Sequence, residues 1–227
     1  MLIGEKTFEK LKNSKIAILG LGGVGSYAAE IIARCGVENI VIFDGDKVDV
    51  TNINRQILAD SETIGRPKTE VMKDRILKIN ENAIVEANFT FFDSSNANNY
   101  DFSSYNYIID AIDTITSKIL LICKAKSEGV PIKSSMGVGN KINPLEIEVA
   151  ELYATQNCPL ARVMRRELKK RGIENLKVVY SKETPKYIPS STDTNGKRIK
   201  SSISFVPSVA GIVLASEVVK NIIGCEK

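Results

Sequence analysis

Gly20-Leu21-Gly22-Gly23-Val24-Gly25 follows a short apolar run, residues 15–19, and opens a segment of helical character, residues 24–35. A second apolar run, residues 38–43, ends at Asp44. Strand, glycine turn, helix and strand within about thirty residues make a βαβ unit. The glycines permit a tight turn, so that backbone amides and the start of the helix can face phosphate oxygens. This stretch therefore predicts a nucleotide-binding site in an α/β fold.

The alternation of strand and helix continues outward from this unit. It predicts helices at residues 69–80 and 117–128 and strands at 84–92, 105–112 and 130–134, followed by a half-exposed strand at 145–152, a basic helix at 159–171, a strand at 176–180 and a buried closing helix at 206–223. The expected fold is Rossmann-like: a doubly wound, mostly parallel sheet with helices on both faces and a C-terminal antiparallel extension.

We expect a single domain over residues 1–227, because 227 residues that are 43% hydrophobic can bury one sizeable core. Its nucleotide-binding core spans residues 1–140, and the extension spans residues 141–227. Within the extension, residues 183–202 are polar, contain two prolines and lack periodicity. Such a segment predicts a mobile loop, and long loops in compact domains often serve function.

The chain contains no histidine, which excludes Ser-His-Asp triads, histidine proton shuttles and histidine zinc sites. Its four cysteines, Cys35, Cys123, Cys158 and Cys225, have neither zinc-knuckle nor CxxC spacing. We therefore expect free thiols in a reducing cytoplasm and no structural zinc.

Neither end of the chain predicts a membrane protein. Residues 1–15 lack the apolar stretch of a signal peptide, and the uncharged run at 201–216 is too short and too polar to span a bilayer. A soluble, cytoplasmic protein is the expected outcome.

The positive charge is concentrated in one segment. Residues 159–200 contain twelve Lys and Arg against four Asp and Glu, whereas residues 1–158 contain 17 against 21. Clustered cations favour a polyanionic partner, because they release counterions from its phosphates. A solvated helix face followed by a charged loop explains the same charge equally well.

Charged residues after the glycine turn indicate which nucleotide binds. Asp44 ends the second predicted strand, where a carboxylate accepts hydrogen bonds from ribose hydroxyls. Arg55 and Lys68 follow on the same sheet edge and suit the charge that accumulates on departing pyrophosphate. Asp113, at the end of the fourth strand, can hold Mg²⁺. Taken singly, each has an ordinary structural explanation: Arg55 could pair with an acid, Lys68 could be a surface lysine and Asp113 could cap a helix.

Five motifs resemble the superfamily of ThiF, MoeB and ubiquitin-activating E1 enzymes: GLGGVGS at 20–26, FDGD at 43–46, TNINRQ at 51–56, GRPK at 65–68 and DAID at 110–113. The resemblance implies a homodimer that adenylates a carboxylate with ATP, with Arg55, Lys68 and Asp113 as catalytic residues and Asp113 on Mg²⁺. The implied ATP site comprises Gly20, Gly22, Gly23, Gly25, Asp44, Asp46, Asn52, Asn54, Arg55, Gln56, Lys68, Asp113 and Thr114.

A narrower resemblance runs through SSMGVG at 134–139, Asn143-Pro144, PLAR at 159–162 and VVYSKE at 178–183. In order and spacing these are similar to the tRNA threonylcarbamoyladenosine dehydratase branch, which activates the threonyl carboxylate of a modified adenosine at tRNA position 37 and closes it into a ring. The resemblance implies the anticodon arm as the partner of the basic segment. The implied contact residues are Arg162, Arg165, Arg166, Lys169, Lys170, Arg171 and Lys182.

Three other functions stay open on the motifs alone. One is an adenylyltransferase that activates the C-terminal glycine of a ubiquitin-like sulfur carrier, although the CxxC pairs typical of those enzymes are missing. The others are a non-catalytic nucleotide-binding adaptor and an NAD oxidoreductase. Cys158 fits a small buried residue near a helix start better than a thioester carrier. A monovalent cation near Gly137 to Gly139 and a sulfur-transfer or electron-transfer partner also stay open.

Overall fold

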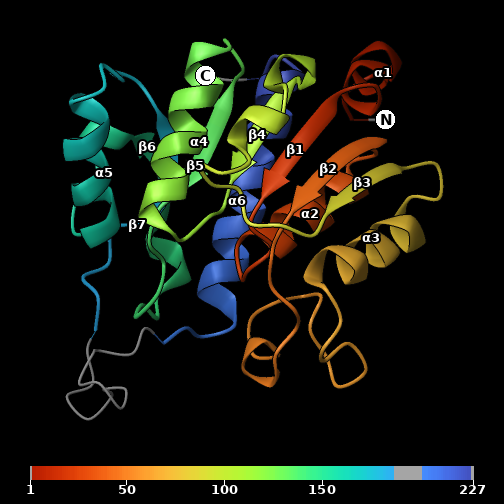
Figure 1. Cartoon of the computed structure of the whole chain (residues 1–227), viewed down its shortest axis with the longest axis horizontal. Coiled ribbons are helices and arrows are strands. Elements are labelled where there is room, and N and C mark those ends of the chain that lie inside the picture. Colours follow the sequence, from red (N-terminus) through yellow and green to blue (C-terminus); the bar gives the residue numbers. More distant parts are fainter. Residues whose placement is uncertain (1, 187–200, 226–227) are drawn as a thin grey trace.

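The computed structural model describes residues 2–186 and 201–225. These residues form six α-helices and seven strands (Figure 1). The helices are α1 (Glu5–Lys12), α2 (Gly25–Arg34), α3 (Lys68–Ile79), α4 (Ile115–Ser127), α5 (Pro159–Lys169) and α6 (Phe205–Ile222). The strands are β1 (Lys15–Leu19), β2 (Asn39–Phe43), β3 (Ile84–Asn88), β4 (Tyr107–Asp110), β5 (Ile132–Ser135), β6 (Ile147–Glu151) and β7 (Lys177–Ser181).

All seven strands join one sheet in the order β3-β2-β1-β4-β5-β7-β6. Every neighbouring pair is parallel except β6 with β7, which is antiparallel, so the predicted fold is confirmed together with its antiparallel extension. The strand order reverses direction between β1 and β4. In open α/β sheets, the crevice at the carboxyl ends of two such strands is where ligands bind.

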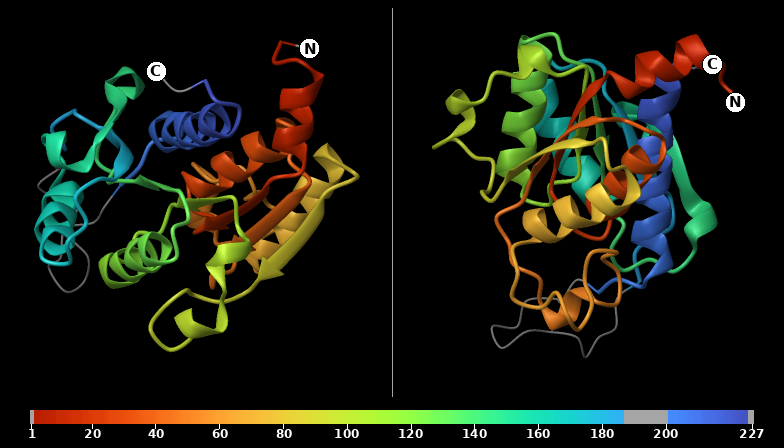
Figure 2. Two further views of the ribbon diagram at one scale, coloured as in Figure 1. Left: turned by 90° about the horizontal axis from the view of Figure 1, so that it is seen from above. Right: turned by 90° about the vertical axis from the view of Figure 1, so that its right-hand side faces the viewer.

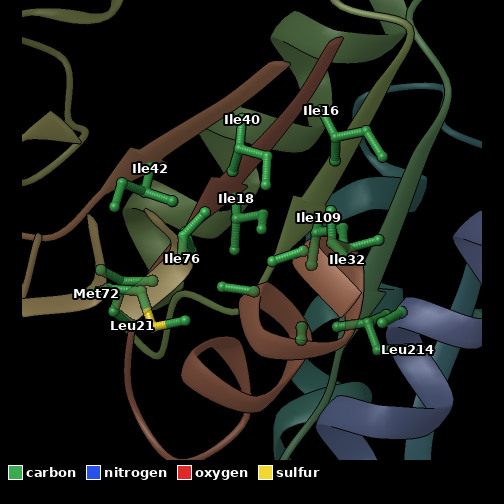
Figure 3. Packing of buried hydrophobic residues seen from close by; sticks show 14 of the residues in the cluster. Ile16, Ile18, Leu21, Ile32, Ile40, Ile42, Met72, Ile76, Ile109 and Leu214 are labelled. Atoms are coloured by element: carbon green, nitrogen blue, oxygen red, sulfur yellow. The ribbon is translucent and has the colours of Figure 1, made fainter. Parts of the chain in front are cut away.

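Side chains of β1 alternate between two cores on opposite faces of the sheet, as the period of a strand requires. Ile16 and Ile18 join the core beneath α2, α3 and α6, whereas Ala17 and Leu19 join the core beneath α4 and α5. Figure 3 shows the first core, with Ile32 and Leu214 packed over the strands. Both faces being covered explains why the central strands read as continuous apolar runs.

Helix α6 packs closely on α2, and both lie on the face of the sheet opposite α4 and α5 (Figure 2). Gly211 permits this approach, because a Cβ on it would collide with the carbonyl oxygen of Val24. By length and composition α6 could also cross a membrane, with mean hydropathy 1.4 over an 18-residue window, but 56% of that window is buried inside the fold. Helix α6 continues to Ile222, six residues past the end of the uncharged run at 201–216, so the length of that run underestimates the length of the apolar helix.

Three details differ from the sequence-based expectations. Helix α1 was not predicted, because its eight residues are mostly polar and bury one side chain, that of Leu11. Strand β3 ends at Asn88, and residues 89–92 form a loop. Of the predicted loop at 183–202, residues 187–200 lie outside the described part of the chain. The residues on its two sides meet at Asn140, which bonds to the backbones of Lys186 and Ser201.

Candidate nucleotide-binding site

The glycine turn lies in the crevice between the carboxyl ends of β1 and β4. Gly20 has φ +91°, and its amide donates to the carbonyl of Phe43 at 2.8 Å. A Cβ on Gly20 would lie 2.7 Å from the carbonyl oxygen of Ala111, and one on Gly25 would collide with the carbonyl of Gly20. Gly22, in contrast, faces open space. The turn is therefore closed on the protein side and open on the side where phosphates would approach.

Asp44 ties the end of β2 to the glycine turn. Its Oδ2 accepts a hydrogen bond from the amide of Leu21 at 2.6 Å, and its Oδ1 accepts one from the amide of Asp46 at 2.8 Å. Burial raises the pKa of this carboxyl, opposed by the positive charge of Lys68 and by the two amides. Each oxygen retains a second lone pair, so the carboxylate can accept ribose hydroxyls while it holds the turn.

Lys68 is the first residue of α3, and both its backbone amide and its side-chain ammonium bind Asp46. Its backbone amide donates to the carbonyl of Asp46 at 3.0 Å, and its ammonium pairs with the Asp46 carboxylate at 2.8 Å. The lysine is 4% exposed, so the ordinary explanation of Lys68 as a surface lysine is wrong. Its charge sits beside Asp44 and Asp46 at the edge of the sheet.

Arg55 lies on the crossover loop between β2 and α3, shortly after a 3₁₀ turn, Val50–Asn52, that Asp49 caps. Its Nη1 donates to the carbonyl of Thr51 at 2.7 Å and to Oδ1 of Asn54 at 2.9 Å. Within residues 2–186 and 201–225, Arg55 forms no salt bridge, so the pairings with acids considered from the sequence are absent. A Cβ on Gly23 would lie 3.3 Å from the Arg55 carbonyl oxygen, which places the loop directly on the glycine turn.

The same loop contains a buried amide with an unpartnered oxygen. Gln56 is 5% exposed, and its Oε1 has no hydrogen-bond partner. The hydroxyl of Thr69, on α3, is also buried without a hydrogen-bond partner. Buried polar atoms without partners are costly and call for an explanation, such as a bound group. Asn54 Nδ2 donates to the carbonyl of Ser202 at 3.0 Å and so joins this loop to the segment that precedes α6.

Asp113 stands at the carboxyl end of β4 as an exposed carboxylate. Its one hydrogen bond among the described residues is a long contact of 3.5 Å from the hydroxyl of Thr114. A free carboxylate at a nucleotide site fits Mg²⁺, which usually binds through one or two carboxylates and substrate phosphates. Residues 2–186 and 201–225 contain no group of three or more Cys, Asp or Glu placed to hold a metal on their own.

A buried ion pair beneath this edge was missed from the sequence. Lys118 on α4 and Asp110 at the end of β4 are both fully buried and pair at 2.7 Å, and Ser134 on β5 donates to the same carboxylate at 2.5 Å. The other Asp110 oxygen accepts from the amide of Ile112 at 3.1 Å and so fixes the start of the loop that carries Asp113. Lys118 follows Asp110 by eight residues, a spacing that predicts nothing until the strand and helix pack together.

The basic residues of α5 and of the two positions after it divide into three groups. Arg165 is half-buried, and its Nη1 donates to the carbonyl of Thr155 at 2.8 Å. Three others surround one carboxylate, Glu167, and hold its pKa down to about 2: they are Arg171, Arg166 and Lys170. Arg162 and Lys169 are exposed and make no salt bridge within the described residues. Lys182, on the segment after β7, lies 3.8 and 3.6 Å from Glu146 and Glu148.

Cys158 caps the start of α5 and is buried, as the preferred interpretation of the sequence expected. Its sulfur accepts from the amide of Ala161 at 3.5 Å and lies 3.8 Å from the carbonyl oxygen of Gly137. All four cysteines are free thiols. The contact with Gly137 places the first turn of α5 at the same edge of the sheet as the glycine turn, because Gly137 follows β5.

Comparison with known proteins gives a consistent result. The model of the ThiF family matches residues 1–227. A tRNA threonylcarbamoyladenosine dehydratase of Bacillus subtilis is 39% identical over 234 residues, which cover 98% of this chain and 92% of the relative. Crystal structures of the Escherichia coli tRNA N6-threonylcarbamoyladenosine dehydratase TcdA, in complex with AMP and with ATP, superpose with TM-scores of 0.90 and 0.89. Each is 33% identical and covers 98% of this chain and 91% of TcdA.

Proposed function

The chain belongs to the ThiF family, and within it we propose that the protein is an ATP-dependent tRNA threonylcarbamoyladenosine dehydratase. It adenylates the threonyl carboxylate of the modified adenosine at tRNA position 37, and the activated acid then closes into a cyclic form. The similarity to dehydratases of the same fold over 98% of the chain supports this function. The narrower sequence resemblance supports it independently.

The observation that carries the chemistry is the meeting of Arg55 and Lys68 with the glycine turn and Asp44 at one edge of the sheet. A Cβ on Gly23 would lie 3.3 Å from both the backbone and the side chain of Arg55, and Lys68 pairs with Asp46, two residues after Asp44. A dinucleotide site has little use for two such cations, whereas departing pyrophosphate needs them. This arrangement supports ATP activation over a plain NAD oxidoreductase.

The reaction needs no protein base, in keeping with a chain that has no histidine. The attacking carboxylate is already ionised at neutral pH, so the enzyme has to align it and neutralise charge. One carboxylate oxygen forms a bond to the α-phosphorus of ATP, and the bond from that phosphorus to the pyrophosphate oxygen breaks. An internal nucleophile of the same substrate then attacks the acyl carbon and AMP leaves, so the net change in the nucleoside is loss of water.

Within this reaction we assign distinct roles to the chain's residues. Amides of the glycine turn face the phosphates, Asp44 accepts the ribose hydroxyls, and Arg55 and Lys68 stabilise the negative charge of pyrophosphate. Asp113 would hold Mg²⁺, which supplies further charge neutralisation on phosphate oxygens when it is bound. The unpartnered oxygen of Gln56 supports a role for this loop at the bound nucleotide.

We propose that the anticodon arm lies along α5, which begins at the edge of the sheet that holds the nucleotide site and runs away from it. In Figure 1 this helix lies toward the β7–β6 end of the sheet, whereas the crossover loop with Arg55 lies toward the β2–β3 end. The nucleotide crevice, between β1 and β4, lies between these two ends of the sheet. A tRNA backbone on α5 can therefore place its modified base at the crevice. Arg162 and Lys169 have free cations for the phosphates.

We further propose a soluble, cytoplasmic homodimer. Four large apolar side chains are exposed on α6 or near its partner β6, and their contact with a second copy would remove them from water. They are Ile142, Leu145, Phe205 and Ile212, with Leu145 88% exposed. Size-exclusion chromatography with light scattering should give a dimer, and Leu145→Asp should shift it toward monomer.

The tRNA assay tests the proposed function directly. Purified protein is incubated with ATP and tRNA that contains threonylcarbamoyladenosine, and the digested nucleosides are weighed by mass spectrometry. We expect loss of water from the modified nucleoside and release of AMP. Unchanged nucleoside mass with a folded protein that binds ATP would refute the assigned substrate. Pyrophosphate exchange that depends on a carrier protein ending in Gly-Gly would favour the adenylyltransferase instead.

A further inference from the structure

A groove with a volume of about 1020 Å³ runs along α4, on the face of the sheet opposite α6 (Figure 2). One wall is a face of α4, and the other wall is residues 171–175, which connect α5 to β7. Residues about one helical turn apart line the first wall, namely Thr116, Leu120, Cys123 and Ser127. We call this cavity the α4 groove.

The α4 groove begins close to the proposed nucleotide site. Thr116 lies on the first turn of α4, three residues after Asp113. Between Thr116 and Ser127 the helix rises about 16 Å. The other wall continues directly from α5, whose exposed cations Arg162 and Lys169 are proposed to meet the tRNA backbone. The groove is therefore next to both the nucleotide crevice and the proposed tRNA surface.

The floor of the α4 groove is apolar and only partly covered. Ile119 is 9% exposed. Leu120, Cys123 and Ile173 are half-buried, so each keeps apolar surface for a ligand in the groove. On the second wall Gly172 has φ +72°, and a Cβ on it would meet no atom within 4 Å. The groove can therefore admit a flat apolar group such as a nucleic-acid base.

Two cations, Lys126 and Arg171, line the end of the groove away from the nucleotide site. Lys126 Nζ donates to Oδ1 of Asn175 at 2.9 Å and forms no salt bridge within the described residues. An ammonium has three N–H donors, so two remain for an anion. Burial lowers the pKa of Lys126, and a phosphate beside it would stabilise the charged form. Arg171 shares its charge with Glu167, and the carboxylate that lines the groove, Glu174, is exposed.

An apolar floor with cations at its border matches an unpaired ribonucleotide, which has an apolar base face and an anionic phosphate. An acidic peptide would also satisfy the cations, but the position beside α5 favours RNA, because a tRNA that contacts α5 passes the groove. We propose that the α4 groove binds unpaired nucleotides of the anticodon loop next to the modified adenosine, with a base on the floor and a phosphate on Lys126. This inference rests on the proposed function and adds a contact surface for its substrate.

Alkylation of Cys123 reports directly whether the groove is occupied, because Cys123 lines it, whereas Cys225 is exposed after α6. Wild-type protein is treated with iodoacetamide with and without tRNA that contains threonylcarbamoyladenosine, and peptide mass spectrometry gives the rate at each cysteine. Free tRNA at about ten times its Kd should slow alkylation of Cys123 roughly tenfold and leave Cys225 unchanged. The anticodon stem-loop should protect Cys123 equally, whereas the same stem closed by a linker without nucleotides should not.

Substitutions at the border of the groove test the phosphate contact. Lys126→Ala should weaken tRNA binding about 3- to 10-fold and lower the salt slope by about one, with ATP binding unchanged. Ser127 is exposed, so Ser127→Glu should weaken tRNA binding and Ser127→Lys should strengthen it without a change in the fold. Lys78→Ala, an exposed lysine of α3 on the opposite face of the sheet, is the matched control and should bind tRNA normally. An unchanged affinity and salt slope in Lys126→Ala would overturn the proposal.

Failure of this inference and failure of the proposed function give different results. If the tRNA loses water in the assay while Cys123 is alkylated at an unchanged rate, RNA does not occupy the groove and a protein partner becomes the better occupant. If the protein neither binds nor modifies the tRNA, the proposed function is refuted and the RNA assignment of the groove with it.

Discussion

Two cations, Arg55 and Lys68, lie at the edge of the sheet that carries the glycine turn, and their different surroundings determine how freely each can bind an anion. Arg55 is held by a carbonyl and an amide oxygen and keeps its full positive charge available, whereas Lys68 is already paired with Asp46. In the proposed site, Lys68 would therefore share its charge between that acid and the phosphates. We therefore expect Arg55 to neutralise more of the pyrophosphate charge than Lys68 in the proposed site.

Removal of either cation gives the first prediction. Arg55→Ala and Lys68→Ala should each lower AMP formation about 10²- to 10³-fold, because each loses a contact that strengthens as charge develops on pyrophosphate. A steady-state assay of AMP release with the tRNA substrate measures this. Lys78→Ala, an exposed lysine on the same helix α3, should leave the rate near normal. Near-normal rates in both active-site variants would contradict their roles.

Asp44 gives a prediction for pH. Because burial raises its pKa, the folded protein takes up a proton more readily than the unfolded chain. The contribution of Asp44 to stability therefore falls as pH rises from its unfolded pKa to its raised folded pKa, and it is greatest at acid pH. Urea unfolding of wild type and Asp44→Asn should show a difference that shifts in favour of wild type as pH falls through this window. A difference independent of pH would contradict the raised pKa.

Helix α5 shows how a run of basic residues is divided when an element packs. Arg165 donates a hydrogen bond to the backbone of Thr155 and so stabilises the fold. Three other cations share the Glu167 carboxylate, whereas Arg162 and Lys169 face solvent. A count of positive charges along the sequence treats these residues as equal. Their contributions to binding a polyanion should differ accordingly.

Substitutions on α5 test this division through tRNA affinity at several salt concentrations. Arg162→Ala should weaken binding and reduce the salt slope by about one, as expected for one lost phosphate contact. Glu167→Gln should strengthen binding, because it releases three cations. Because those cations lower the pKa of Glu167 to about 2, the carboxylate stays ionised and the gain should persist at every pH above about 2 at which the protein is folded. Arg165→Ala should instead lower thermal stability. Equal effects of Arg162→Ala and Arg165→Ala on affinity would refute the division.

The folded molecule depends on a polar contact at its centre as well as on its two apolar cores. Asp110 and Lys118 are both fully buried, so the loss of one partner leaves an uncompensated charge. Lys118→Met should lower the free energy of unfolding by about 3–5 kcal/mol. Arg66→Met removes a pair with Asp74 at the protein surface, where the two side chains are 45% and 52% exposed, and should cost much less, because exposed ion pairs contribute little to stability. Urea unfolding measures both, and equal losses would show that burial of the pair contributes nothing.

The arrangement of strands and helices, the glycine turn and the order of the charged motifs follow from local sequence. Apolar periodicity, glycine and proline act within a few residues, so the chain pattern predicts β1, α2 and β2 within one residue at most ends, and the parallel sheet with them. The eight-residue helix α1 was lost because a short polar helix gives little periodic signal. The candidate site residues could be predicted from the same pattern, because they lie just after the ends of the predicted strands.

The contacts that these side chains make depend on packing between segments that are distant in the sequence. The burial of Lys118 with Asp110 and Ser134 and the difference between Arg162 and Arg165 both depend on contacts between segments whose separation in sequence carries no period. Hydrogen bonds and ion pairs depend on distance, direction and removal from water, and folding sets all three. Sequence therefore indicated which chemical groups the site has, and packing set which of them are free to act on a ligand.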